Sequence, residues 1–309
     1  MPSLNLVDFA DLFGTTRDMI PPHLCDKIAA GNWKYEVLKD ADRDAVVMEM
    51  LRRIDERRLT FVENEDKSRW EKGWGENRDA FNATGGDLTA LIPKYIRPNQ
   101  AVRLYGDFVR TENPNFELDW YMIFRQWFFE TYLSGYENIF EFGSGSGFNV
   151  AALASMYPKS KITGLDWASP SVEIVENLRK IHKLNTVGRQ FDFFHPDASV
   201  EVPAGSAILT IGALEQTGTN WGDLLLFFIS KKPACVYHIE PMYEWYDHEN
   251  NTVDYSAWKA HEVRNFWRGF PQALIELENA GKIRILKSKR AYFGSLVLEG
   301  YSQLIWQPL

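Results

Sequence analysis

The chain has 309 residues, of which 45% are hydrophobic and 25% are charged, an ordinary composition for a globular protein. This length suffices for one large α/β domain with an added lobe, or for two modest domains. The formal net charge of −8 argues against nucleic acid as a general partner, because an acidic surface repels phosphates. No apolar run is long enough to span a bilayer, so we expect no membrane association.

Two features of the sequence favour a cytoplasmic protein. The first residues, Met1–Leu6, lack the basic segment and the long apolar core of a signal peptide. The two cysteines, Cys25 and Cys235, lie far apart and form neither a disulfide framework nor a zinc pattern. We therefore expect a reducing, cytoplasmic location.

The N-terminal third is predicted to be mainly helical. Apolar residues at helical spacing, with charges between them, indicate a helix over 40–58. The polar stretch 63–86 is rich in glycine and asparagine but also carries Trp70 and Trp74. We interpret it as a loop or lid rather than a linker, because linkers rarely contain two tryptophans.

A boundary between two parts of the chain is predicted near residue 115. Prolines in 91–98 mark the passage between lobes, and a dense apolar helix over 116–133 ends before Gly135. We therefore divide the chain into an N-terminal helical lobe or lid, 1–115, and a ligand-binding domain, 116–309.

Strands and helices alternate in the second part. Strands are predicted at 138–142, 161–165, 190–194, 206–211 and 234–239, and helices at 147–157, 169–184, 219–231 and 256–280. Two strand-like segments without a helix between them, 282–289 and 303–306, are predicted to form an antiparallel pair at one edge. The predicted fold class is α/β, with a doubly wound, mostly parallel, seven-stranded sheet.

A glycine-rich loop follows the first of these strands. Residues 139–148 read as an apolar strand, then glycines at every second position, then a helix start. A sharp turn with a ligand against its backbone requires residues without Cβ, so the segment predicts a nucleoside-containing ligand. Dinucleotide folds use G-x-G-x-x-G, whereas Phe148 here occupies the place of the last glycine, where it would obstruct a pyrophosphate site.

An acidic residue, Glu141, stands two residues before the first glycine and suits a cationic ligand better than a pyrophosphate. This Glu-x-Gly-x-Gly-x-Gly pattern resembles the first motif of class I S-adenosylmethionine-dependent methyltransferases. In that family the acidic residue contacts the amino acid end of the cofactor, and the glycines make room for it. The resemblance implies cofactor contacts by Glu141, Gly143, Ser144, Gly145 and Gly147.

Two further strand ends extend the resemblance. Asp166 ends the second strand, where the family's acidic residue holds both ribose hydroxyls, and Trp167 would stack on adenine. Asp197 and Ala198 match the third motif, beside the adenine amino group. The alternative, that both aspartates only cap helices, is disfavoured because open sheets bind ligands at the carboxyl ends of their strands.

The fourth region, 208–216, resembles the family's fourth strand and its cofactor-facing end, which adds Gly212 and Glu215 to the predicted cofactor site. Glu215 would face either the cofactor or the acceptor. The resemblance covers roughly residues 116–309 and includes the closing antiparallel pair. It implies S-adenosyl-L-methionine as the methyl donor and S-adenosyl-L-homocysteine (SAH) as the product.

The acceptor side of the site is predicted from residues after the fifth strand. Transfer to a hydroxyl requires alignment of the nucleophile and removal of a proton. Glu240, at the strand tip, is the first choice for acceptor contact and catalysis, and Tyr243 for shaping the pocket. His248 and His261 are further acid–base candidates, although both also fit surface or packing positions. The spacing of these residues matches no metal motif, so we predict no metal.

Missing motifs narrow the acceptor class. There is no Asn/Asp-Pro-Pro-aromatic motif for amino-methylation and no paired cysteines for 5-methylpyrimidine formation. A small-molecule acceptor is therefore predicted, methylated on a hydroxyl of a sugar or secondary metabolite. Residues 293–306 also resemble sugar methyltransferases of bacterial surface-polysaccharide pathways.

Several alternatives remain open at this point. The N-terminal lobe would either close over the site or form a homodimer interface. An NAD(P)-dependent oxidoreductase would need a different glycine spacing. A methyltransferase-like binding subunit would keep the cofactor motifs but lack a functional acceptor site.

Overall fold

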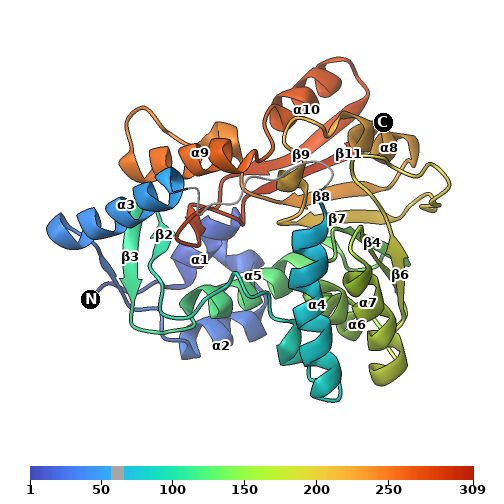
Figure 1. Cartoon of the computed structure of the whole chain (residues 1–309), viewed down its shortest axis with the longest axis horizontal. Helices are drawn as coiled ribbons and strands as arrows, with labels where there is room; N and C mark the ends of the chain where they lie inside the picture. Colours follow the sequence, from blue (N-terminus) through green and yellow to red (C-terminus); the bar gives the residue numbers. More distant parts are fainter. Residues whose placement is uncertain (57–65) are drawn as a thin grey trace.

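A seven-stranded sheet forms the centre of the computed structural model, which describes residues 1–56 and 66–309 (Figure 1). The strand order is β6-β5-β4-β7-β8-β11-β9. Neighbours from β6 to β8 pair in parallel, and β11 runs antiparallel to both β8 and β9. The strands are β4 Asn138–Phe142, β5 Lys161–Asp166, β6 Thr186–Gln190, β7 Ala207–Ile211, β8 Cys235–Ile239, β9 Ile283–Lys289 and β11 Gln303–Pro308. The predicted doubly wound, mostly parallel sheet with its antiparallel pair is confirmed.

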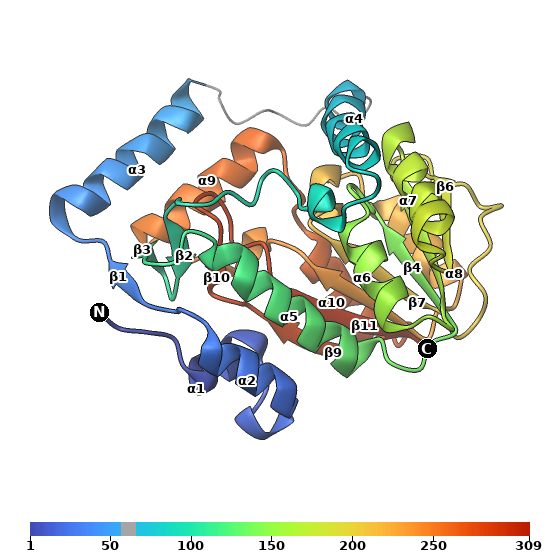
Figure 2. The ribbon, with the colours of Figure 1, turned by 90° about the horizontal axis from the view of Figure 1, so that it is seen from below.

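Helices cover both faces of this sheet because successive strand residues point to opposite sides. Ile139 packs in the core cluster of α5, α6 and α7, whereas Phe140 packs in that of α8 and α10. Figure 2 shows α5, α6 and α7 on the near side of the sheet. The bounds are α5 Phe116–Tyr132, α6 Phe148–Met156, α7 Ser169–His182, α8 Gly222–Ser230 and α10 Phe270–Asn279.

The third parallel strand lies earlier in the chain than predicted. The phenylalanine-rich run 190–194 has high strand propensity, but the strand that pairs with β5 is β6, Thr186–Gln190. Gly188 permits this register because a Cβ there would lie 2.6 Å from the Val172 carbonyl oxygen of α7. The strand prediction at 190–194 is therefore wrong.

The helix predicted over 256–280 is two helices, α9 Thr252–Arg264 and α10. Asn265 and Gly269 both adopt left-handed backbone conformations, with φ of 55° and 80°. Pro271 then stands in the first turn of α10, where its missing N–H leaves no hydrogen bond unmade. These three residues end one helix and start the next.

The N-terminal part contains helices, as predicted, together with a small sheet that the sequence did not reveal. The helices are α1 Leu6–Phe13, α2 Pro22–Ala30, α3 Asp40–Asp55 and α4 Ser68–Ala83. The small sheet has the order β1-β3-β2-β10, from β1 Tyr35–Val37, β3 Asp107–Thr111, β2 Val102–Leu104 and β10 Phe293–Gly294. Its last strand comes from the C-terminal part, and one core cluster contains residues from both parts. The boundary near residue 115 stays a prediction.

A loop or lid was expected over 63–86, and Ser68–Ala83 form helix α4 instead of a loop. The role of a lid stays a prediction, and residues 63–65 lie outside the described residues. The helix lies along α7, where Arg78 pairs with Glu173 at 3.0 Å and Asn177 donates to Asn82 (Figure 2). Its position places one end of α4 over the glycine loop. The helix expected over 40–58 corresponds to α3, which ends at Asp55. Residues 57–58 are not among the residues that the structure describes.

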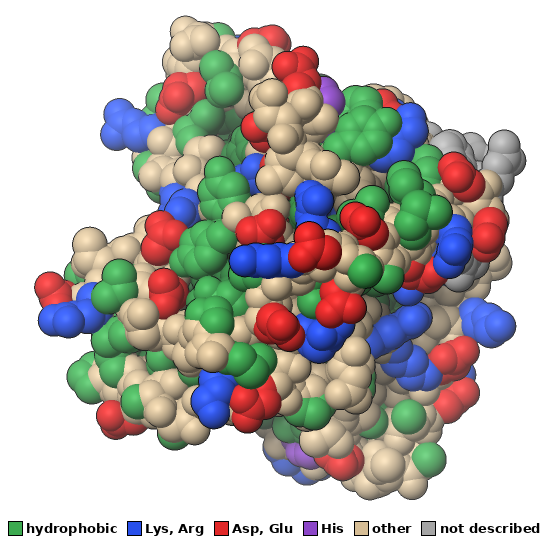
Figure 3. All heavy atoms as spheres, turned by 90° about the vertical axis from the view of Figure 1, so that its left-hand side faces the viewer, with side chains coloured by type: hydrophobic (Ala, Val, Ile, Leu, Met, Phe, Trp, Pro, Cys, Tyr) green, Lys and Arg blue, Asp and Glu red, His purple; other side chains and the backbone are tan. Residues whose placement is uncertain are grey.

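The surface near the N-terminal elements has a mixed charge. Figure 3 shows acidic and basic side chains interspersed on this face. One example is Arg110, which lies within ion-pair distance of both Glu36 and Asp42. None of the helices in the described residues has the length and apolar character needed to cross a membrane.

Candidate active site

Two adjoining cavities lie at the carboxyl ends of β4, β5 and β7. We call the first the aromatic cavity; it has a volume of about 560 Å³, part of it open to solvent, and its lining includes Trp70, Trp74, Trp167, Phe191, Phe193 and Phe194 around Asp166. We call the second the polar cavity; it has a volume of about 1870 Å³, part of it open to solvent, and its lining includes Tyr95, Glu117, Tyr121, Glu141, Glu215 and Arg264. Gly143, Gly145 and Gly212 line both cavities, which therefore form one continuous cleft.

The glycine loop between β4 and α6 has no room for side chains on the cleft side. Gly143 and Gly145 have φ of +77° and +50°, in the left-handed region. A Cβ on Gly143 would lie 2.3 Å from the Ala213 Cβ, and one on Gly145 would lie 2.9 Å from Trp74 Cζ2. The two glycines let the backbone form the floor of the cleft.

The third glycine of the motif has a different position. Gly147 caps α6 with φ +72°, and a Cβ there would lie 2.9 Å from Ile174 of α7. It lines neither cavity, so its small size serves the packing of α6 on α7. Ser144 lines the polar cavity, and its buried hydroxyl has no hydrogen-bond partner among the described residues.

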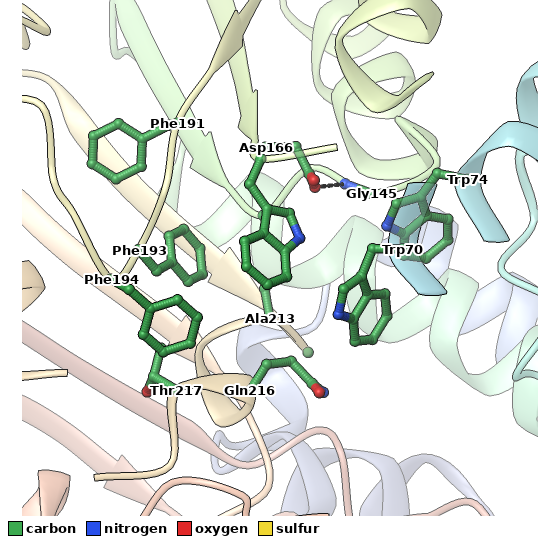
Figure 4. Close-up of a pocket in the computed structure, with 13 residues that line it drawn as sticks. Trp70, Trp74, Gly145, Asp166, Phe191, Phe193, Phe194, Ala213, Gln216 and Thr217 are labelled. Carbon is green, nitrogen blue, oxygen red and sulfur yellow. Dashed lines mark hydrogen bonds between the residues drawn. The ribbon is translucent and has the colours of Figure 1, made fainter. Parts of the chain in front are cut away.

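Asp166 joins the end of β5 to the glycine loop. Its buried carboxylate accepts a hydrogen bond from the Gly145 N–H at 2.8 Å (Figure 4). It also accepts one from the Ala168 N–H at 2.9 Å. Burial raises the pKa of Asp166 to about 6, although these hydrogen bonds act in the opposite direction. The side chain lines the aromatic cavity, as expected for a residue at the carboxyl end of a strand.

Glu141 lines the polar cavity and has one buried carboxyl oxygen without a partner among the described residues. Its Oε1 accepts from Asn149 Nδ2 at 3.0 Å, while its buried Oε2 has no partner among the described residues. Burial raises the pKa of Glu141 to about 8, although Asn149 and Arg125 oppose this shift. Without a donor or a cation this buried carboxyl group is favoured in its neutral form, and a ligand that supplies a cation would favour the ionised form.

The side chains around Asn149 fix how it meets Glu141. Its Oδ1 accepts from the Tyr121 hydroxyl at 2.7 Å and from Arg125 at 3.3 Å, which leaves its N–H₂ group to face Glu141. The Arg125 guanidinium also stacks on Phe148, 4.0 Å from the ring centre. Phe148 therefore fills the position that a dinucleotide fold leaves to glycine.

Aromatic rings form the walls of the aromatic cavity. Figure 4 shows Phe193 and Phe194 on one side of the cavity and Trp70 on the other. The ring centres of Trp167 and Phe194 are 5.8 Å apart. Trp70 and Trp74 stack with ring centres 6.0 Å apart, and both come from α4. The helix therefore supplies part of the cavity wall, and the rings leave a slot suited to a flat aromatic group.

Asp197 and Ala198 lie outside both cavities. Both residues are exposed, and the Asp197 carboxylate accepts from the Ser199 N–H and hydroxyl at 2.8 Å each. Because β6 ends at Gln190, the chain has already left the sheet edge when it reaches them. The residues that follow β6 in the cavity wall are Phe191, Phe193 and Phe194.

Glu240 lies beneath the cleft rather than in its wall. Its buried carboxylate accepts from the backbone N–H groups of Ala213, at 3.0 and 3.1 Å, and Leu214, at 3.1 Å. It thereby holds the short helix η3, Leu214–Thr217, which carries Glu215. Burial and the nearby Glu215 carboxylate raise the pKa of Glu240 well above its ordinary value. Glu215 itself lines the polar cavity, with a buried Oε2 that has no partner in the described structure.

The structure does not bring Tyr243, His248 or His261 into either cavity. Tyr243 and His248 both stack on Trp258, with ring centres 5.6 and 4.4 Å from it. His261 is buried, and burial with nearby arginines lowers its pKa to about 3, so its ring is neutral. Together these rings form an aromatic cluster between the 243–248 segment and α9.

Several residues of the polar cavity were not found from the sequence. Glu117 lies on the apolar helix α5, where the Tyr301 hydroxyl donates to its Oε1 at 3.0 Å. Burial raises the pKa of Glu117 to about 7. A carboxylate within a dense apolar helix is a signal that could have identified it. Tyr95, Arg264 and Tyr301 come from segments far apart in sequence, and no local pattern joins them.

Comparisons with known proteins find similar solved structures, but they find no family or relative by sequence. No protein-family model matches the chain, and a search of curated proteins finds no match. The N-terminal domain of EvdMO1, solved with SAH and D-fucose, is 18% identical, covering 60% of this chain and 80% of that one at a TM-score of 0.40. The plantazolicin methyltransferase BpumL with SAH is 11% identical, covering 85% and 98% at 0.44. A SAM-dependent methyltransferase from Aquifex aeolicus is 17% identical, covering 56% and 81% at 0.34.

Proposed function

We propose that this chain is a class I S-adenosylmethionine-dependent methyltransferase that acts on a small molecule. The observation that carries the proposal is the position of two acidic residues beside the glycine loop. Glu141 and Asp166 both line the cleft that this loop borders. Open α/β sheets bind ligands at this edge. The unpartnered Oε2 of Glu141 calls for a cation, and the amino group of S-adenosylmethionine supplies one.

The other residues of the cleft also fit this cofactor. Asp166 retains acceptor capacity for ribose hydroxyls beyond the two backbone N–H groups that it accepts from. The ring slot beside Trp167 suits adenine, and Gly143 and Gly145 let the ligand approach the backbone. When bound, S-adenosylmethionine supplies an activated methyl group on its sulfonium.

We further propose that the acceptor is methylated on a hydroxyl and occupies the polar cavity, in a cytoplasmic enzyme. The support is Glu215, which lines this cavity and whose carboxyl group lies close to that of Glu240. Two buried carboxyl groups at short range share protons readily, so Glu215 would take the hydroxyl proton while Glu240 holds its backbone in place. The cavity is large enough for a sugar or a secondary metabolite beside the cofactor.

Calorimetry with SAH, S-adenosylmethionine and NADH tests the assignment of the cofactor. We expect SAH and S-adenosylmethionine to bind in a one-to-one ratio and NADH not to bind, because Phe148 and its contact with Arg125 close the pyrophosphate position. Tight binding of NADH with no binding of SAH would instead favour an oxidoreductase. Binding of SAH without turnover on any hydroxylated acceptor would favour a non-catalytic subunit.

Binding of SAH is expected to release protons at neutral pH. In the free protein the pKa of Glu141 is about 8, so the carboxyl is mostly protonated at pH 7. Contact with an ammonium group favours the ionised form, so about one proton should leave at pH 7 and far less at pH 9. Titrations in phosphate and Tris buffers measure this number, since their ionisation enthalpies differ. Equal binding enthalpies in both buffers at pH 7 would contradict the placement of the ammonium group at Glu141.

A further inference from the structure

The polar cavity is lined by several positive side chains in addition to Glu117, Glu141 and Glu215. Four arginine side chains line it: Arg53, Arg69, Arg97 and Arg264. Arg53 pairs with Glu49 at 2.8 Å, whereas the other three form no ion pair with any residue in 1–56 or 66–309. On a chain with a net charge of −8, three arginines that form no ion pair within these described ranges, gathered around one cavity, are a local concentration of positive charge.

Arg264 is the most deeply placed of the three. It is the last residue of α9, and its guanidinium stacks on Phe266 with its carbon 4.3 Å from the ring centre. Its buried Nε donates to no described residue. A buried cation with an unpaired donor is costly, so a negative group of a ligand in the polar cavity would be stabilised beside this guanidinium.

Arg69 adds a second positive charge to the same cavity. It lies at the start of α4, with its guanidinium carbon 5.1 Å from the centre of the Trp70 ring. Burial and the Arg69 charge lower the pKa of Arg264 to about 10, although the Glu215 carboxylate opposes this shift. Repulsion between cations is unfavourable unless a negative ligand joins them, and guanidinium groups suit carboxylate and phosphate oxygens.

We propose that the acceptor carries an acidic group, a carboxylate or a phosphate, and that Arg264 and Arg69 form the subsite that binds it. Arg97, an exposed residue, contributes a third positive charge to the lining of this cavity. Glu215 lines the same cavity, so the acidic group and the reacting hydroxyl would belong to one molecule. This inference rests on the proposed function, of which it specifies the acceptor class.

The test measures binding to the SAH-saturated protein by calorimetry. The probes are inorganic phosphate, glucuronate and glucose 6-phosphate, each compared with glucose, which has the same ring but no charge. We expect at least one acidic probe to bind where glucose does not, and the preferred probe identifies carboxylate or phosphate. Arg264→Gln should weaken that probe about tenfold or more, because it removes a charge-assisted hydrogen bond. Arg284→Gln, which removes an exposed positive charge from β9, should leave binding unchanged.

Two results would overturn the inference while leaving the proposed function intact. One is SAH binding without preference for any acidic probe over glucose. The other is an Arg264→Gln protein that loses affinity for SAH itself, because the arginine would then hold the cofactor's carboxylate. Failure of the wild-type protein to bind SAH would instead contradict the proposed function.

Discussion

Replacement of Glu141 by glutamine is expected to weaken SAH binding about 100-fold, because a buried, charge-assisted contact is lost and the ligand's ammonium group is left without a counterion. Glutamine has the same shape and can still accept from Asn149, which keeps the local hydrogen bond. The substitution therefore removes the charge at Oε2 and little else. Calorimetry on the purified variant measures the effect.

A matched control for Glu141→Gln is available one residue before β4. Glu137 is exposed, so Glu137→Gln changes the net charge equally but should leave SAH affinity unchanged. Unfolding of Glu141→Gln should occur at or above the wild-type temperature, because the variant no longer buries an ionisable carboxyl. Equal SAH affinity in wild type and Glu141→Gln would show that the ammonium group is held elsewhere.

The floor of the cleft could be predicted from the sequence because its signals are local. An apolar strand, an acidic residue and alternating glycines occur within ten consecutive positions, 139–148, and each reflects a backbone requirement. The same holds for Asp166, which ends a strand directly before a helix. The structure places Glu141, Gly143, Gly145 and Asp166 in the walls of the cleft.

Other parts of the site depend on packing that a single sequence does not show. Propensity favours a strand over 190–194, yet the approach of α7 at Gly188 decides the register and leaves Asp197 outside the cleft. Glu240 stands at a strand tip, as predicted. The backbone of 213–215, however, covers it and uses its carboxylate as a hydrogen-bond acceptor.

The walls of the polar cavity are the least predictable part. Tyr95, Glu117, Arg264 and Tyr301 come from four segments, and only the closed fold brings them together. Tyr95 is 57% exposed and would be interpreted from its sequence as an ordinary surface residue between prolines. A Cβ on Gly212 would nevertheless lie 3.9 Å from the Tyr95 hydroxyl, so this side chain reaches the end of β7.

The second large effect is expected in the glycine loop, where Gly143→Ala should lower the free energy of unfolding. Alanine at this position must adopt φ +77° and would place its Cβ 2.3 Å from that of Ala213. Gly205→Ala is the matched control, because Gly205 has a similar φ of +81° but no atom within 4 Å of a Cβ. The control should lose about 1 kcal/mol of unfolding free energy from backbone strain alone. Gly143→Ala should lose about 3 kcal/mol, since overpacking adds to the same strain.

A double mutant separates the contact from the strain. Ala213→Gly removes the clashing methyl group, after which the nearest atom to a Cβ at position 143 is Phe193 Cζ at 3.3 Å. In chemical denaturation, Gly143→Ala combined with Ala213→Gly should therefore be more stable than the sum of the two single changes by about 1–2 kcal/mol. Additive losses would mean that the loop relaxes away from Ala213. In that case the need for glycine at position 143 would not come from the close approach of the segments that follow β4 and β7.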